Sequence, residues 1–311
     1  MSDFETLAVV GLGLLGGSVA GAARQRRSVS RVVGISRRPE MATRAVECGF
    51  CDEAGTDLAA GVREADLVVL ATPVFAMEET LRTLGPHLSP GCLVTDVGSV
   101  KGILADTLPG LLPPGVRYVG SHPMAGSHAS GLAFARADLF EGAACVVTPR
   151  GPDDESAADR LAAFWSELGA RVERREPACH DDEVAWVSHL PHIVAFAYAR
   201  ALEAAGPSAA ALKGAGFRDF TRVARSEPEM WADILVTNRK ALVAPLEEAG
   251  RRLAELARRI EAGDLEAVSA ELSAARDLLA RSEWKTDGDE TARSGGEIPE
   301  IQAAPVAATK E

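Results

Sequence analysis

The segment Thr6-Leu-Ala-Val-Val-Gly-Leu-Gly-Leu-Leu-Gly16 decides the fold class of this chain. The apolar run from Thr6 to Val10 predicts a buried strand, and the Ala-rich stretch after the glycines has helical character. Between them stands a GxGxxG pattern, Gly11-Leu12-Gly13-Leu14-Leu15-Gly16. A GxGxxG placed between a strand and a helix is typical of a dinucleotide-binding βαβ unit.

Each glycine of this pattern has a separate physical task. The first, Gly11, allows the tight turn, the second, Gly13, lets the backbone approach the pyrophosphate, and the third, Gly16, lets helix and strand pack closely. The free N–H groups and the dipole of the helix N-terminus then hold the phosphates. We therefore predict cofactor contacts from Gly11, Gly13, Leu14, Leu15 and Gly16.

The stretch from Leu7 to Ala23 carries no charge, but it does not have the features of a signal peptide or a membrane span. The residues before it are Met-Ser-Asp-Phe-Glu, without a positive charge, and five glycines interrupt it. We expect no membrane contact.

Short apolar runs alternate with helical segments from residue 6 to about 175, a pattern typical of βαβ units around a parallel sheet. Near-continuous Val and Leu content predicts strands buried on both faces. The expected fold is α/β, a Rossmann-type doubly wound parallel sheet over residues 1–176. The predicted strands are Thr6–Val10, Arg31–Ile35, Asp66–Ala71, Leu93–Val97, Tyr118–Gly120, Cys145–Thr148 and Arg171–Glu173.

After Pro177 the strand signal stops, and an all-helical second domain is predicted over residues 177–283. Two apolar stripes at helical spacing run from Leu246 to Ile260 and from Leu265 to Leu279, separated by Gly263 and the N-cap residue Asp264. Such a helical hairpin either packs on a partner subunit, giving a homodimer, or covers its own domain. Residues 284–311 lack periodicity and are predicted to be a disordered tail, too short for a regulatory domain.

Composition narrows the classes of partner. Acidic residues outnumber basic ones 45 to 33, a net charge of −12 that argues against a nucleic-acid or anionic membrane surface. Five cysteines are an odd number, which favours free thiols in a reducing cytoplasm. Cys48 and Cys51 have CxxC spacing without a second pair, and Gly49 is expected to end a helix, so we interpret the cysteines as structural.

The end of the second predicted strand bears on which dinucleotide binds. An Asp or Glu there would accept from the ribose 2′-hydroxyl of NAD, but this chain has Ser36-Arg37-Arg38. Two guanidinium groups suit a 2′-phosphate. We predict a preference for NADP, with NAD as the alternative.

Polar clusters that follow predicted strands are candidates for the chemistry, because ligands of such sheets bind at the carboxyl ends of the strands. Three qualify: Thr72-Pro73, the run Asp-Val-Gly-Ser-Val-Lys101, and the run Ser-His-Pro-Met-Ala-Gly126. Two more lie in the helical part: Ser-His-Leu-Pro-His192 and Phe-Arg-Asp-Phe-Thr-Arg222.

The glycine turn and these motifs, in this order and spacing, resemble the prephenate and arogenate dehydrogenases of tyrosine biosynthesis. The resemblance covers residues 6 to about 280. It implies an oxidative decarboxylation in which a hydride leaves the carbinol carbon of a cyclohexadienol while the ring carboxylate leaves as CO2. The enzyme has to take the hydroxyl proton, align the carbinol hydrogen with the nicotinamide and hold the dianion.

The resemblance also implies roles for individual residues. It makes His122 the base, in keeping with the pKa of an imidazole, and Ser99 a hydrogen-bonding partner that aligns the reactants. From the residues alone, Ser99 could also serve in part as a helix N-cap. Arg222 is expected to bind a substrate carboxylate. The remaining substrate-binding residues are expected to be His189, Asp219 and Ser127, and those beside the cofactor Ser36, Arg37, Arg38, Thr72 and Pro73.

Several alternatives remain open at this point. His189 and His192, with His180, Asp181 and Asp182 nearby, could suggest a metal site. Hydride transfer to a nicotinamide needs no Lewis acid, however, and no metal is expected. A β-hydroxyacid dehydrogenase would use a helical lysine, for which Lys213 is the candidate, and a dinucleotide-sensing regulator would need a basic patch. Prephenate is favoured slightly over arogenate, and His192 stays without a role.

Overall fold

The computed structural model describes residues 3–126 and 130–281. Ser127 and the predicted tail at 284–311 lie outside the described residues. The chain divides into two compact units between Ala249 and Gly250, and each is described by itself.

The central feature of the first unit is a six-stranded sheet of order β3-β2-β1-β4-β5-β6, in which every pair is parallel. Four of the strands match predicted ones in place, which confirms the parallel sheet, and a fifth, β6, overlaps a predicted strand at Tyr118 alone. The sixth, β3, is a short segment, Glu-Ala-Gly, without an apolar run to predict it. The bounds are β1 Thr6–Val10, β2 Arg31–Ile35, β3 Glu53–Gly55, β4 Leu67–Leu70, β5 Leu93–Asp96 and β6 Arg117–Tyr118.

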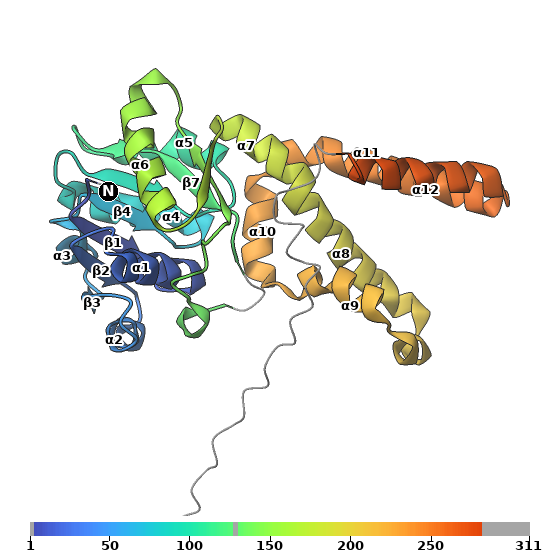
Figure 1. The fold of residues 1–311 in the computed structure, drawn as a ribbon, viewed down its shortest axis with the longest axis horizontal. Coiled ribbons are helices and arrows are strands. Elements are labelled where there is room, and N and C mark those ends of the chain that lie inside the picture. The colour runs from blue at the N-terminus through green and yellow to red at the C-terminus, as the bar shows by residue number, and fades with distance from the viewer. Residues whose placement is uncertain (1–2, 127–129, 282–311) are drawn as a thin grey trace, which may run out of the picture. The chain divides into compact units, whose positions relative to one another are not determined.

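Helices cover both faces of this sheet (Figure 1). Along β1, Leu7 and Val9 belong to one apolar cluster, with side chains of α1 and α6. Ala8 and Val10 belong to a second cluster, with side chains of α3, α4 and α5. Because alternate residues of a strand face opposite sides, the two clusters confirm the doubly wound arrangement. The helices are α1 Leu14–Arg26, α2 Pro39–Glu47, α3 Leu58–Val62, α4 Val74–Leu84, α5 Gly102–Thr107 and α6 Glu155–Glu167.

A second, three-stranded sheet corrects one prediction. The segment expected as a single strand at Tyr118–Gly120 is divided: β6 ends at Tyr118, and β7, Gly120–Pro123, joins β8 Ala144–Thr148 and β9 Arg171–Arg174 in the order β7-β8-β9. β7 runs antiparallel to β8, with His122 opposite Val146. Gly-Ser-His-Pro has no β-branched residue to predict a strand, so its extended form depends on pairing with the distant β8.

Over the described residues 177–281 the chain is helical, as predicted. Its main helices are α7 Pro177–Val184, α8 Leu190–Ala201, α9 Ala215–Arg222, α10 Pro228–Thr237 and α11 Arg239–Glu261, with a π-helical turn at Ala185–His189. Short 3₁₀ helices lie at Gly85–His87, Leu108–Leu111, Leu132–Phe134, Pro152–Asp154, Leu202–Ala205, Pro207–Leu212 and Val223–Arg225.

Two carboxylates from the helical segment after residue 176 cap helices that cover the parallel sheet. Neither α4 nor α5 has a local side-chain cap. Asp233 of α10 accepts from the backbone N–H of Phe75, at 3.2 Å, and Asp181 of α7 accepts from those of Lys101 and Gly102, at 2.7 and 2.8 Å. The interpretation of Ser99 as a cap is therefore wrong, because Asp181 satisfies the first turn of α5.

The unit that begins at Gly250 contains the end of α11 and α12, Leu265–Leu279. Gly263 has a φ of +68°, and the Asp264 carboxylate accepts from the Ala267 N–H at 3.0 Å, so both predicted boundary signals are confirmed. Leu253, Ile260 and Leu272 of the predicted stripes are 62%, 61% and 57% exposed. Both stripes are therefore exposed in the described part of the chain. Within the described ranges, no helix is long and apolar enough to cross a membrane.

Candidate active site

The glycine turn has the geometry that its three glycines predict. Gly11 adopts a φ of +103°, and a β-carbon there would lie 2.7 Å from the Ala71 carbonyl oxygen. A β-carbon at Gly16 would lie 1.9 Å from the Gly11 carbonyl oxygen, so this glycine is required for packing. At Gly13 no atom lies within 4 Å of the β-carbon position. The open space at Gly13 leaves room for a pyrophosphate to approach the backbone, and the turn fits a dinucleotide.

The other predicted cofactor residues follow strands that adjoin β1 in the sheet. Ser36, Arg37 and Arg38 follow β2, and Thr72 and Pro73 follow β4. Both arginines are exposed and have no ion-pair partner in the part of the chain that the structure describes. The Thr72 hydroxyl is buried without a hydrogen-bond partner. This edge therefore carries free positive charge and an unsatisfied hydroxyl beside the glycine turn.

His122 lies on β7 and begins a chain of buried polar groups. Its Nδ1 is 2.8 Å from Nε2 of His180, and Nδ1 of His180 is 2.9 Å from an oxygen of Asp181. Because a carboxylate accepts, His180 donates from Nδ1 and accepts at Nε2, so His122 donates from its own Nδ1. This leaves the lone pair of neutral His122 on Nε2, the arrangement a general base requires.

The electrostatic surroundings keep His122 neutral. Burial lowers the pKa of His122 well below its ordinary value, and the neighbouring His180 and Lys101 lower it further. At neutral pH the imidazole is therefore able to take a proton.

A buried lysine supports the strand that carries His122. Lys101 is fully buried, forms an ion pair with Asp96 and donates to the Ser121 carbonyl oxygen at 2.8 Å. The Tyr118 hydroxyl donates to the second Asp96 oxygen at 2.7 Å. Burial lowers the pKa of Lys101, and Asp96 opposes that shift. This network holds the end of β5, the start of α5 and β7 in one arrangement.

The helical segment contributes a second buried histidine, His189. Burial lowers the pKa of His189 to about 4, and its ring lies edge-on to Trp231 with centroids 6.0 Å apart. Its Nδ1 is 3.0 Å from the side-chain nitrogen of Asn238. His192 stacks on the same Trp231 at 3.7 Å.

The predicted substrate residues on α9 are placed differently. Arg222 and Asp219 are both exposed. Burial lowers the pKa of His192, and the positive charge of Arg222 lowers it further, which places Arg222 in the surroundings of that ring. Ser99 is half-buried just after β5. The structure thus joins His122 and His189 through buried contacts and leaves Arg222 open to solvent.

Three residues of this network were not predicted as site residues: His180, Asp181 and Asn238. His180 and Asp181 were noted only as metal candidates, and the structure instead shows them orienting His122. The one signal in the sequence was that His180 and Asp181 are adjacent, a histidine followed by a carboxylate. No group of three or more metal-ligating side chains is found among residues 3–126 and 130–281.

The CxxC pair has no features of a reactive site. Cys51 is buried, and burial raises the pKa of its thiol to about 12, whereas Cys48 is exposed at the end of α2. Gly49 follows with a φ of +72°, which confirms it as the residue that ends this helix.

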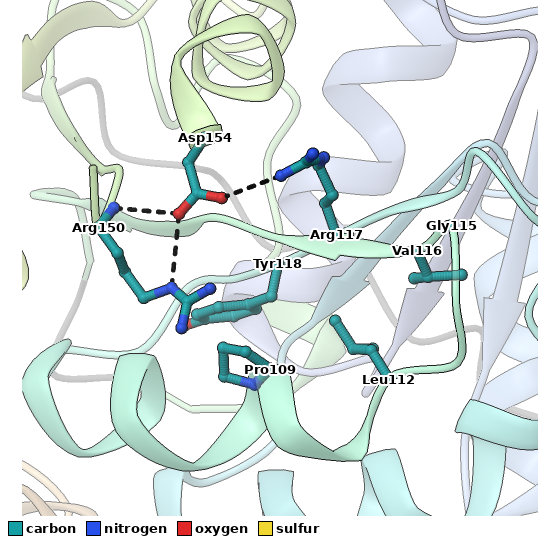
Figure 2. Close-up of a pocket in the computed structure, with 8 residues that line it drawn as sticks. All are labelled: Pro109, Leu112, Gly115, Val116, Arg117, Tyr118, Arg150 and Asp154. Carbon is teal, nitrogen blue, oxygen red and sulfur yellow. Dashed lines mark hydrogen bonds and ion pairs between the residues drawn. The ribbon is translucent and has the colours of Figure 1, made fainter. Parts of the chain in front are cut away.

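A hollow of about 230 Å³ lies apart from the predicted site residues (Figure 2). Asp154 lies between Arg117 and Arg150, with ion-pair distances of 3.6 and 3.4 Å, and Pro109 and Leu112 form an apolar wall. Tyr118 also lines it, and the Tyr118 hydroxyl donates to Asp96, so the hollow adjoins the buried Asp96 network.

The sheet order and the glycine turn together define a Rossmann-type dinucleotide-binding fold, followed by a helical second part. Residues 19–174 match the family model for the prephenate dehydrogenase nucleotide-binding domain, and residues 176–274 match that for the prephenate dehydrogenase dimerization domain. The chain belongs to the prephenate dehydrogenase family.

Individual relatives agree with this assignment. The chain is 36% identical to prephenate dehydrogenase of Bacillus subtilis over 84% of this chain and 72% of that protein. It is 34% identical to cyclohexadienyl dehydrogenase of Zymomonas mobilis, over 79% and 85%. The crystal structure of Aquifex aeolicus prephenate dehydrogenase with hydroxyphenyl propionate and NAD+ has a TM-score of 0.81 and 33% identity, over 88% and 96%. Synechocystis arogenate dehydrogenase has a TM-score of 0.74 and 35% identity, over 88% and 98%.

Proposed function

We propose that this chain is an NAD(P)-dependent prephenate dehydrogenase, which converts prephenate to 4-hydroxyphenylpyruvate and CO2 in L-tyrosine biosynthesis. The observation that carries the proposal is the chain from Asp181 through His180 to His122, which ends in an imidazole with its lone pair on Nε2. Arogenate is the second candidate substrate, since one structural relative is an arogenate dehydrogenase.

His122 takes the proton of the substrate hydroxyl at Nε2 as the hydride leaves the carbinol carbon. The dinucleotide, when bound, accepts that hydride. The ring then loses its carboxylate as CO2, and the electron pair of the broken C–C bond completes the aromatic ring. His122 returns its proton to the phenolate oxygen. His180 and Asp181 hold the imidazole in the required tautomer, and Lys101 fixes the strand beneath it.

The substrate would be held by side chains from the sheet region of the first unit and from the helical segment that follows residue 176. We assign Ser99 to the reacting hydroxyl, Arg222 to a carboxylate, and His189 and Asp219 to positions beside the guanidinium or the substrate. Ser127, outside the described residues, keeps its predicted contact with the substrate.

NADP is the proposed cofactor, with NAD as the alternative. The exposed Arg37 and Arg38 follow β2, where the pattern that favours NAD has a carboxylate. Gly11, Gly13 and Gly16, with Leu14 and Leu15, would hold the pyrophosphate at the start of α1. Thr72 and Pro73 would line the same edge.

Two other features support a homodimer and a cytoplasmic location. The exposed apolar stripes of α11 and α12, together with the family's dimerization domain, support a homodimer formed through the helical domain at residues 177–283. The five cysteines are free thiols, which supports the cytoplasm as the compartment.

A four-way assay tests the proposed reaction. Purified protein is mixed with prephenate or arogenate, each with NADP or NAD, and formation of the reduced nicotinamide is followed by absorbance. We expect turnover of prephenate, with the higher kcat/KM for NADP. Turnover of arogenate alone would reject prephenate as the substrate, a higher kcat/KM with NAD would reject the cofactor preference, and no turnover in any arm would reject the family reaction for this chain.

A further inference from the structure

Asn238 lies between α10 and α11 and contacts the buried His189. We propose that Asn238 fixes His189 as a hydrogen-bond donor at Nε2, and that this donor binds an acceptor oxygen of the substrate, a keto or carboxylate oxygen. The second half of this statement rests on the proposed function, whereas the first half concerns the protein without ligand.

The contacts of Asn238 determine which way its amide points. Asn238 is 3% exposed, and its Nδ2 is 2.9 Å from the Asp181 carbonyl oxygen and 3.0 Å from Nδ1 of His189. A carbonyl oxygen only accepts, so the amide atom facing it must be the nitrogen. The two N–H groups of this nitrogen then serve the two acceptors.

This arrangement determines the tautomer of His189. Since Nδ1 accepts from Asn238, it carries no proton, and a neutral imidazole must hold its proton on Nε2. Burial lowers the pKa of His189 to about 4, so the ring is neutral at pH 7. His189 is 0% exposed, and its Nε2 has no hydrogen-bond partner in the described part of the chain. A buried N–H without a partner is rare in a folded protein, and it points to a ligand that supplies an acceptor.

Asp181, whose backbone oxygen holds Asn238, also sets the opposite tautomer at His122. The Asp181 carboxylate accepts from His180 and thereby places the His122 lone pair on Nε2, while the Asp181 backbone oxygen accepts from Asn238. One turn of α7 therefore yields an acceptor at His122 and a donor at His189. The acceptor suits the hydroxyl that loses its proton, and the donor suits an oxygen that has no proton to give.

The first test reads the tautomer without any substrate. In protein labelled with ¹⁵N-histidine, we expect His189 at pH 7 to show an unprotonated Nδ1 and a protonated Nε2. Asn238→Asp offers an acceptor in place of the donor, so the proton should move to Nδ1 and the pKa of His189 should rise. A protonated Nδ1 in the unmodified protein, or the same tautomer in Asn238→Asp, would overturn the first half of the proposal.

The second test reads the substrate contact. We expect Asn238→Asp to raise the KM for prephenate about tenfold while the KM for the dinucleotide changes less than twofold. Asn238→Ala, which removes the amide without adding charge, keeps the test decisive if the aspartate variant does not fold. The matched control is Arg239→Ala, an exposed neighbour that should leave both constants unchanged.

The outcomes separate this proposal from the proposed function. If the tautomer is as stated but neither Asn238 variant changes the KM for prephenate, the substrate contact is rejected and the fixed tautomer stands. If the unmodified protein shows the expected tautomer but turns over neither prephenate nor arogenate, the proposed function is rejected and the role of Asn238 in the protein stands.

Discussion

The glycine turn at Gly11–Gly16 and the histidine cluster of His122, His180 and His189 are built in opposite ways. The turn offers backbone atoms from six consecutive residues, and its geometry depends on missing side chains. The cluster offers side chains from β7, α7 and the π-helical turn, and two hydrogen-bond chains that meet at Asp181 set its protonation. A phosphate needs only N–H groups and space, whereas a proton transfer needs one particular lone pair.

Because of this difference, substitutions in the two regions should affect different properties of the protein. A side chain added to the turn acts by steric overlap and affects packing or phosphate approach. We expect a conservative substitution in the cluster to change mainly which atom carries a proton. Stability measurements should therefore be most sensitive to the turn and rate measurements to the cluster.

The largest effect is expected at the base. His122→Asn should lower kcat roughly 10²- to 10⁴-fold with little change in KM, because the proton loses its acceptor while binding contacts remain. Steady-state rates measure this, with dinucleotide affinity and thermal unfolding as checks on the fold. Near-normal turnover would end the role of His122 as base.

The next largest effect is expected from a β-carbon in the turn. Gly16→Ala should lower the free energy of unfolding by about 3 kcal/mol or more, because the β-carbon would lie 1.9 Å from the Gly11 carbonyl oxygen. Gly13→Ala is the matched control: with no atom within 4 Å it should leave the unfolding free energy nearly unchanged but weaken dinucleotide binding. Urea unfolding and calorimetric titration separate the two, and equal unfolding free energies for both variants would contradict the assignment of Gly16 to packing.

A smaller effect is expected at the exposed guanidinium. Arg222→Ala should raise the KM for prephenate roughly thirtyfold. The loss of a charged hydrogen bond to a carboxylate would weaken substrate binding by about 2 kcal/mol. Arg225→Ala removes another exposed arginine nearby and should change KM little. An unchanged KM in Arg222→Ala would mean that the carboxylate is held elsewhere.

The smallest effect is expected on the free energy of unfolding when the pH is lowered. His189 has a folded pKa of about 4, below its ordinary 6.5, so between these values the unfolded chain binds a proton that the folded protein does not. Stability therefore falls as pH falls, by about 2 kcal/mol from pH 7 to pH 5 for this residue. Urea unfolding at both pH values should show a smaller loss in His189→Gln and an unchanged loss in a variant of the exposed His87. An equal loss in His189→Gln would contradict the assignment.

Much of the fold was predictable because its signals are local. The runs at Thr6–Val10 and Arg31–Ile35 are strands at the predicted bounds, and Gly49 and Gly263 end helices as predicted. β7 was not predictable, because its strand geometry comes from pairing with β8, some twenty residues further on. Asn238 was not predictable either, since an asparagine between two helices has no pattern that indicates a buried partner.

The sequence by itself determined the dinucleotide turn, the parallel sheet and the helical second half, because glycine spacing, apolar runs and helical period act over a few residues. The motifs also indicated His122 as the base. Only the tertiary structure decided which atom of His122 can accept a proton and which atom of His189 can donate one. The first property depends on Asp181, which acts on His122 through His180, and the second depends on Asn238, which contacts His189. These groups are far apart in the chain and come together only when the helical segment packs against the sheet.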